Sequence, residues 1–237
     1  YGNPFADSES DFGDTFTDWD LQYANDEKIT VHADNEGAWD PDVSYGNGNF
    51  LVAWEEGPAY WVPYSFGFKQ EIRASIYEPG EDDPVVFDKR IYKDSTTYFR
   101  NEDPSIAYSD SKWFVAWEHY DTVANPGAYT MDIKGRTVQK SGDALSLGTV
   151  YDICDENNCQ ADPKVVYDNV NDKFMVIWED ARSGMNDYDL YAQFVNADTG
   201  APTGSEITIC DDANTQCEPW AAFDPDNEQY MIVWEEG

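Results

Sequence analysis

The chain has 237 residues, a length that fits one all-β domain or two small ones and that supports a sizeable buried core. Its 48 acidic and 14 basic residues give a formal net charge of −34, so it lacks the basic face that binds nucleic acid, and an anionic membrane surface is disfavoured. Cations are the expected partners. The 9 Trp, 16 Tyr and 12 Phe residues argue against disorder, and the absence of an apolar run of about 18 residues argues against membrane insertion.

Four segments repeat one pattern: an acid, a proline, a short apolar strand, a polar turn, a second apolar strand and Trp-Glu. They begin at Asp40, Asp103, Asp162 and Glu218. Each segment predicts a β-hairpin, because its turn carries the Gly, Asn, Asp or Ser residues that turns require. Both faces of each hairpin are apolar, as expected for the stacked blades of a β-propeller.

Two further strand candidates follow Trp-Glu in each of the first three copies, at 71–77 and 85–92, 132–138 and 150–153, and 189–195 and 206–209. The fourth copy has only two strands. Its other half is expected near the N-terminus, where Asp18-Trp-Asp-Leu21 resembles Asp187-Tyr-Asp-Leu190.

The sequence therefore predicts an all-β, four-bladed β-propeller of four-stranded antiparallel blades, with the last blade shared between the N- and C-terminal segments. The predicted blades are 40–102, 103–161, 162–217, and 218–237 together with 12–39.

The segment from Trp178 to Gly200, WEDARSGMNDYDLYAQFVNADTG, resembles the Trp-Glu-Asp…Asp-(Ile/Leu)-Tyr-Ala-Gln repeats of large secreted bacterial and archaeal β-propeller proteins. The match is good in the third copy and degenerate in the others, notably the first. The resemblance implies an extracellular, often surface-attached and non-catalytic role, and it names no substrate.

An acid pair recurs in every copy. A register that pairs Val43 with Val52 and Tyr45 with Phe50 places the acid before each proline opposite the glutamate of Trp-Glu. Opposed like charges repel unless neutralised, and calcium prefers such hard oxygen ligands, so the pairs are expected to bind calcium around one channel mouth. Alternatively, they accept backbone N–H bonds or face water. The pairs are Asp40–Glu55, Asp103–Glu118, Asp162–Glu179 and Glu218–Glu235.

A second candidate calcium site lies in the loop after Trp178, where acidic residues alternate, and a similar pattern occurs near the N-terminus. The residues are Asp180, Asn186, Asp187 and Asp189, echoed by Asp14, Asp18 and Asp20. Alternate aspartates are a common calcium pattern, although no EF-hand motif is present. The alternatives are a solvated turn and a salt-loving host whose proteins are acidic without specific calcium.

The four cysteines form two local pairs in similar acidic loops, Cys154 with Cys159 and Cys210 with Cys217. These pairs are predicted to be disulfides, which indicate an oxidising compartment. A zinc site is the alternative, but the spacings and the surrounding hard oxygens favour disulfides. The expected location is extracellular or at the cell surface.

No catalytic residue is predicted, because His32 and His119 lie in no recognisable motif and the acid pairs recur in every copy, whereas a glycosidase needs one distinctive site. The sequence therefore predicts a non-enzymatic, calcium-stabilised subunit of a surface polymer or fibre, whose partner is itself. The N-terminal strands either close the last blade within one chain or are donated to a neighbouring copy. The alternatives are a lectin-like propeller that binds cell-surface glycans through the aromatic loop at 60–68, and a glycoside hydrolase.

Overall fold

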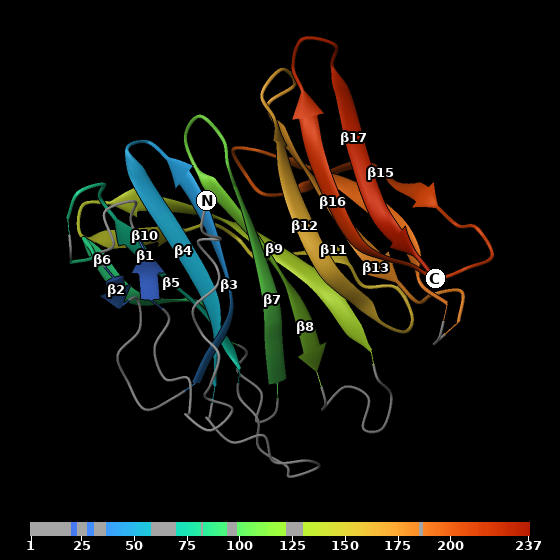
Figure 1. Ribbon diagram of the computed structural model, residues 1–237, viewed down its shortest axis with the longest axis horizontal. Coiled ribbons are helices and arrows are strands. Elements are labelled where there is room, and N and C mark those ends of the chain that lie inside the picture. Colours follow the sequence, from blue (N-terminus) through green and yellow to red (C-terminus); the bar gives the residue numbers. More distant parts are fainter. Residues whose placement is uncertain are drawn as a thin grey trace, which may run out of the picture.

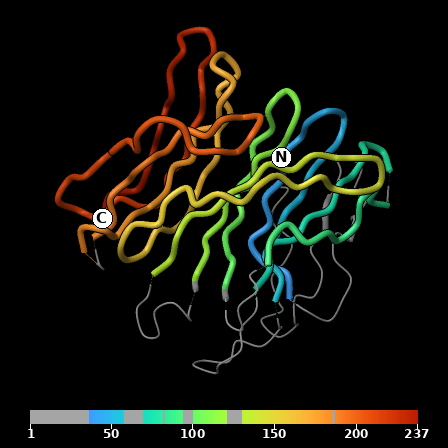
Figure 2. The backbone as a smooth tube through the Cα atoms, turned by 180° about the vertical axis from the view of Figure 1, so that it is seen from behind, coloured from blue at the N-terminus to red at the C-terminus, as the bar shows by residue number. Residues whose placement is uncertain are grey.

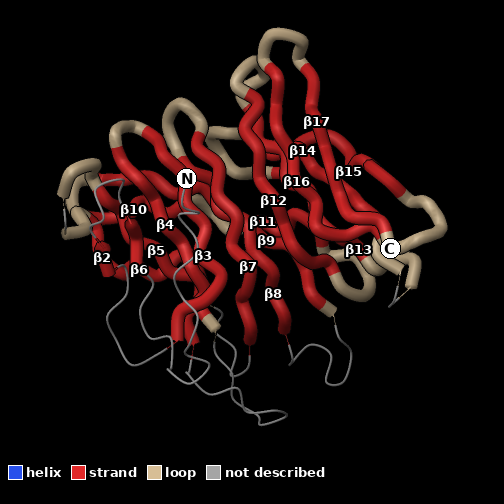
Figure 3. The backbone as a smooth tube through the Cα atoms, in the orientation of Figure 1, coloured by secondary structure: helices blue, strands red, loops and turns tan. Residues whose placement is uncertain are grey.

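The computed structural model describes residues 20–22, 28–30, 37–57, 70–81, 83–93, 99–121, 130–184 and 187–237. Every regular element in these ranges is a strand (Figure 3). These ranges contain no helix that is long and apolar enough to cross a membrane.

The strands are β1 (Asp20–Gln22), β2 (Lys28–Thr30), β3 (Gly37–Gly46), β4 (Asn49–Gly57), β5 (Glu71–Tyr77), β6 (Val86–Tyr92), β7 (Phe99–Tyr108), β8 (Trp113–Asp121), β9 (Met131–Ser141), β10 (Ala144–Leu147), β11 (Tyr151–Cys154), β12 (Gln160–Asp168), β13 (Lys173–Asp180), β14 (Asp189–Asn196), β15 (Pro202–Cys210), β16 (Gln216–Asp224) and β17 (Gln229–Glu236).

Four antiparallel sheets follow one another along the chain. Blade 1 is β3-β4-β5-β6, blade 2 is β7-β8-β9 with both β10 and β11 paired to β9, and blade 3 is β12-β13-β14-β15. Of the described strands, β16 and β17 make up blade 4. Among the described strands, β1 and β2 pair only with each other.

The blades form an open arc, with blade 1 at one end and blade 4 at the other (Figures 1 and 2). The first strands lie side by side in the order β3, β7, β12, β16. Sheets packed face to face about their first strands define a β-propeller, so the predicted all-β propeller class is confirmed. The predicted closed ring of four complete blades is not seen, because β1 and β2 do not extend blade 4. Residues 12–19, 23–27 and 31–36 lie outside the described ranges.

The core consists of the junctions between successive blades. The front face of a blade is defined here as the side that carries Val43 and Val52 in blade 1, and the back face as the side that carries Leu51 and Ala53. The back face of blade 1 packs against the front face of blade 2, where Trp113, Val115 and Trp117 are buried. The junctions of blade 2 with blade 3 and of blade 3 with blade 4 are built in the same way.

The predicted hairpin register is confirmed in all four copies, including Val43 opposite Val52 and Tyr45 opposite Phe50. It breaks at a β-bulge formed by each acid and its proline. The acids Asp40, Asp103, Asp162 and Glu218 have φ values of 45°, 47°, 49° and 53°.

The predicted opposition of each acid to the glutamate of Trp-Glu is therefore wrong by one residue. Each glutamate instead lies opposite the residue before the acid: Trp39 with Glu55, Glu102 with Glu118, Ala161 with Glu179, and Cys217 with Glu235. Proline has no N–H to offer the ladder, and the left-handed acid bends the strand, so both residues are skipped in the pairing.

Candidate functional site

A cavity of about 510 Å³ lies among the first strands of all four blades. Its wall is formed by the bulges and the residues just after them: Asp40, Pro41, Asp42 and Val43, Asp103, Pro104, Ser105 and Ile106, Lys164 and Val165, and Trp220 and Ala221. The volume is in the range of small-molecule sites. Among the predicted acids, Asp40 and Asp103 line the cavity.

The position after each proline makes the cavity asymmetric. It is the residue at which strand pairing resumes, and it is Asp42, Ser105, Lys164 or Trp220 in the four blades. The same repeat position thus carries a carboxylate in blade 1, a hydroxyl in blade 2, an ammonium group in blade 3 and an indole in blade 4. These four residues are not predictable from the features that the repeats share. The signal was the position at which the repeats differ.

Hydrogen bonds between blades fix two of these side chains. The N–H of Ile106 in blade 2 donates to Asp42 Oδ2 of blade 1 at 2.6 Å, and the N–H of Val43 donates to Asp42 Oδ1 at 2.7 Å. The N–H of Val165 in blade 3 donates to Ser105 Oγ of blade 2 at 3.1 Å. The cavity wall is therefore held by the same contacts that join the blades.

The glutamates of Trp-Glu form a second row of contacts between blades. Glu118 Oε1 accepts the N–H of Asp162 at 2.7 Å, and Glu179 Oε1 accepts the N–H of Glu218 at 2.7 Å. Each contact joins one blade to the bulge of the next. Glu118 and Glu179 were predicted either to bind calcium or to accept backbone N–H bonds, and in the structure both accept backbone N–H bonds.

Burial and crowding raise the pKa values of several carboxyls here. Burial, together with the charges of Asp40, Glu102 and Asp162, raises the pKa of Asp103 to about 6. Burial, reinforced by Glu102 and other nearby acids, raises the pKa of Glu55 to about 9. Burial also raises the pKa of Glu118. Shifted carboxyls beside a cavity are a physical sign of a functional site.

An aromatic side chain lies on the same wall. The Trp220 side chain is 64% exposed. The Lys164 Nζ atom lies 5.4 Å from the centre of the Trp220 ring and forms an ion pair with Asp162. The cavity thus presents an indole face together with carboxyls, which gives one apolar surface beside several hydrogen-bonding groups.

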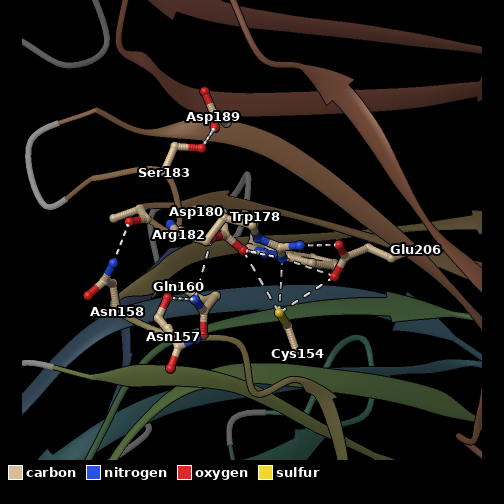
Figure 4. A network of polar contacts seen from close by, with 11 residues as sticks. Cys154, Asn157, Asn158, Gln160, Trp178, Asp180, Arg182, Ser183, Asp189 and Glu206 are labelled. Atoms are coloured by element: carbon tan, nitrogen blue, oxygen red, sulfur yellow. Dashed lines mark hydrogen bonds and ion pairs between the residues drawn. The ribbon is translucent and has the colours of Figure 1, made fainter.

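In the second predicted calcium site, Asp180 and Asp189 already have hydrogen-bond partners within the protein. Asp180 is buried and accepts hydrogen bonds from Trp178 Nε1 at 2.9 Å, Arg182 N at 2.8 Å and Arg182 Nη2 at 2.5 Å (Figure 4). Asp189 accepts a hydrogen bond from Ser183 Oγ at 2.7 Å. An arginine therefore neutralises Asp180.

Asp187 is half-buried. Asp14, Asp18 and Asn186 lie outside the described residues, and only the backbone of Asp20 is described. Within the described ranges, no group of three or more His, Cys, Asp or Glu side chains is arranged to hold a metal ion. Calcium at either predicted site stays a prediction.

The structure forms no disulfide between Cys154 and Cys159 or between Cys210 and Cys217. The Cys154 Sγ atom lies 3.4 Å from Arg182 Nη2 and 3.6 Å from Glu206 Oε2 (Figure 4). This thiol therefore faces an arginine–carboxylate cluster in blade 3, and burial raises its pKa. The predicted aromatic loop at 60–68 and His32 lie outside the described residues.

No protein-family model matches the sequence. No curated protein sequence matches it either. The family resemblance of the third repeat stays a prediction.

Solved structures of carbohydrate-active enzymes share the fold. One is an α-L-arabinofuranosidase from Lactobacillus brevis (TM-score 0.50, 16% identity, 90% of this chain and 72% of that chain). Another is an N-acetylgalactosamine deacetylase from F. plautii in complex with blood group B trisaccharide (TM-score 0.54, 14% identity, 94% and 67%). A third is a family 117 glycoside hydrolase from Zobellia galactanivorans (TM-score 0.51, 12% identity, 85% and 67%).

These neighbours contradict the prediction that the protein is not an enzyme, since several of them are glycoside hydrolases. They give no support to the predicted role as a structural subunit of a polymer. The premise behind the prediction was that a repeated acid pair leaves no distinctive site. That premise fails because Asp42, Ser105, Lys164 and Trp220 differ from blade to blade.

Proposed function

We propose that the chain is a carbohydrate-active β-propeller that hydrolyses glycosides in the cavity at its first strands. The observation that carries this proposal is the pair Asp40 and Asp103, which line one cavity from adjacent blades, where burial and then the charge of Asp40 raise the pKa of Asp103. Glycoside hydrolysis uses two carboxyl groups, one protonated and one ionised. Crowded carboxyls of unequal environment supply that combination.

In this proposal Asp103 is the proton donor. Its pKa of about 6 keeps a useful fraction protonated near neutral pH. As the bond between the anomeric carbon and the glycosidic oxygen breaks, Asp103 gives its proton to the departing oxygen. The Asp40 carboxylate assists attack on the anomeric carbon; the oxygen of water ends bonded to that carbon, and the proton that this water loses returns to the carboxyl pair and restores Asp103.

The rest of the wall would position the glycan. The exposed Trp220 indole offers a flat apolar surface on which a sugar ring can stack, and Lys164 and Ser105 offer hydrogen bonds to hydroxyl groups. The arabinofuranosidase and glycoside hydrolases among the structural neighbours support a glycan as the substrate class. We place this activity outside the cell or at its surface.

The test is a hydrolysis screen over aryl glycosides and oligosaccharides, including α-L-arabinofuranosides. For a hydrolysed substrate, Asp103→Asn should lower the rate by about 10²–10⁴-fold, the usual contribution of a positioned proton donor. The matched control is Asp143→Asn, because Asp143 lies exposed in the turn between β9 and β10. Absence of hydrolysis across the panel, or equal rates for Asp103→Asn and the control, would contradict the proposal.

Glycan binding is a second candidate function, favoured by the exposure of Trp220. Calorimetric titration with the same oligosaccharides should then give binding that Trp220→Ala abolishes. Phe87→Ala is the control, because Phe87 is an exposed aromatic residue on β6 that does not line the cavity. Binding without turnover would favour this function over hydrolysis.

A further inference from the structure

The charges on the cavity wall are unbalanced. Of the described residues that line the cavity, Asp40, Asp42 and Asp103 are acidic and Lys164 is basic. The Lys164 ammonium group already forms an ion pair with Asp162, whose Oδ1 lies 2.5 Å from Nζ. The three lining carboxyls therefore share one cation with a fourth acid, and the wall carries an excess of negative charge.

Asp42 is the one acid of the wall to which the proposed hydrolysis assigns no role. Its carboxylate is held in place, because Oδ1 accepts the N–H of Val43 at 2.7 Å and Oδ2 accepts the N–H of Ile106 at 2.6 Å. Each carboxylate oxygen has two lone pairs, so each keeps one acceptor position for a ligand. The half-buried Asp42 thus presents a fixed carboxylate with spare acceptor positions at the cavity.

The surroundings of Asp42 supply too little positive charge. Burial raises the pKa of Asp42, although two backbone hydrogen bonds and the charge of Lys164 act in the opposite direction. A carboxylate that is partly removed from water without enough compensating charge is stabilised by a cation that approaches it. A positively charged group on a ligand would supply that compensation.

Ser105, at the equivalent position of blade 2, indicates a second feature of the ligand. It lines the cavity although it is only 8% exposed. Its Oγ accepts the N–H of Val165 at 3.1 Å, but no acceptor among the described residues takes its hydroxyl proton. A buried donor that lacks an acceptor costs free energy. The hydroxyl proton of Ser105 is therefore available to an oxygen atom of a ligand.

The two side chains can meet one ligand. Ser105 directly precedes Ile106, whose N–H binds Asp42, so the hydroxyl and the carboxylate belong to the same part of the wall. The carboxylate suits an ammonium group, which has three N–H donors, and the hydroxyl suits an oxygen acceptor beside it. A sugar with a free amino group carries an ammonium group and hydroxyl oxygens on adjacent carbon atoms, and so combines both features.

We propose that the substrate of the cavity is an amino sugar, whose protonated amine binds Asp42 and whose neighbouring oxygen accepts the hydroxyl proton of Ser105. This inference rests on the proposed function, because it names the substrate class of the same cavity. The net charge of −34 acts in the same direction, since it attracts cationic ligands and repels sugars that carry a carboxylate. N-acetylation of the amine removes its charge and should remove the preference.

The experiment compares matched sugars in binding and in hydrolysis. Methyl and aryl glycosides of glucose and galactose carry an amine, an acetamide or a hydroxyl at the carbon next to the anomeric centre, and the corresponding uronic acids complete the series. Calorimetric titration is done at about pH 6, at which the amine is charged and Asp103 is about half protonated. The wild type should bind the amine about ten- to a hundredfold more tightly than the hydroxyl form, the range expected for a hydrogen bond between charged groups. The preference should shrink at about 1 M salt, which screens charges.

Asp42→Asn should abolish the preference for the amine, because an amide carries no charge. Asp143→Asn, in the exposed turn between β9 and β10, is the control and should keep the wild-type ratio. The ratio of the wild type tests the proposal by itself if Asp42→Asn does not fold. Equal binding of amine and hydroxyl forms by the wild type would overturn the proposal, as would a preference for the uronic acids or a folded Asp42→Asn protein that keeps the wild-type ratio.

The two readouts separate this inference from the proposed function. Amine-selective binding without turnover of any glycoside would support the amino-sugar ligand and contradict hydrolysis. Turnover of neutral glycosides without selectivity for the amine would support hydrolysis and contradict the amino-sugar substrate.

Discussion

At the scale of single residues, several carboxyls near the bulges have raised pKa values and hold their protons at unusually high pH. Glu55 is buried beside Glu102 and other acids, and the Nε2 of Gln70 donates to its Oε1 at 3.2 Å. Burial disfavours the charged form, and neighbouring negative charges disfavour it further. The folded protein therefore binds protons that the unfolded chain releases.

This difference predicts that stability falls as pH rises. The pKa of Glu55 is about 9 in the folded protein against an ordinary value of 4.5, so its contribution is fully present below pH 4.5 and is lost as pH rises through 9. Asp103, with a pKa of about 6, acts in the same direction at lower pH. The melting temperature should be lower at pH 9 than at pH 5, by about 2–4 °C for each kcal/mol lost.

Glu55→Gln should reduce that difference, because an amide at this position cannot ionise and can still accept a hydrogen bond. Glu156→Gln, at an exposed position, is the matched control and should leave the pH dependence unchanged. If both variants showed the same fall between pH 5 and pH 9, Glu55 would not be its source.

At the scale of elements, the bulges and glutamates decide how blades meet. The left-handed φ of Asp162 turns its N–H toward Glu118 of the preceding blade, and Asp42 and Ser105 receive N–H groups in the same direction along the chain. Blade order is therefore fixed by polar contacts as well as by apolar packing.

Two substitutions at Glu118 separate its hydrogen bond from its charge. Glu118→Ala leaves the N–H of the half-buried Asp162 without its acceptor and should cost about 1–3 kcal/mol in the free energy of unfolding. Glu118→Gln keeps an acceptor oxygen and removes a crowded acid, so it should be near neutral or stabilising at alkaline pH. Denaturant unfolding measures both. Equal destabilisation by the two variants would show that the hydrogen bond does not join the blades.

The register of the β-hairpins was predictable from the sequence, but the β-bulges at their bases were not. Alternating apolar residues set the pairs Val43–Val52 and Tyr45–Phe50, because a hairpin's register depends on nearby residues. The left-handed φ of Asp40 does not change the alternation of apolar residues. The predicted register of each acid against the glutamate of Trp-Glu is therefore wrong by one residue. The cavity was not predictable either, because Asp42 and Trp220 line it together only once strands far apart in the sequence pack side by side.

At the scale of the whole molecule, the excess of acids contributes unfavourably to the free energy of folding. With 48 acids against 14 bases, long-range repulsion destabilises the compact state. The described ion pairs neutralise some acids, as Arg182 does for Asp180. Bound cations would relieve the rest.

The calcium prediction is tested by thermal melting with and without a chelator at fixed ionic strength. If calcium binds the folded state alone, its removal should lower stability by about 2.7 kcal/mol for a starting concentration one hundred times the dissociation constant. An unchanged melting temperature would refute bound calcium and indicate that general salt screening suffices.

The most direct measurement on the proposed site is the pH dependence of the hydrolysis rate for wild type and Asp103→Asn. A proton donor with a pKa of about 6 should lose activity above that pH, by about tenfold for each pH unit. Asp103→Asn should be slow at every pH and should lack this limb. A wild-type rate that stays level from pH 5 to pH 8, or a variant that keeps the falling limb, would contradict the assignment of Asp103 and with it the catalytic cavity.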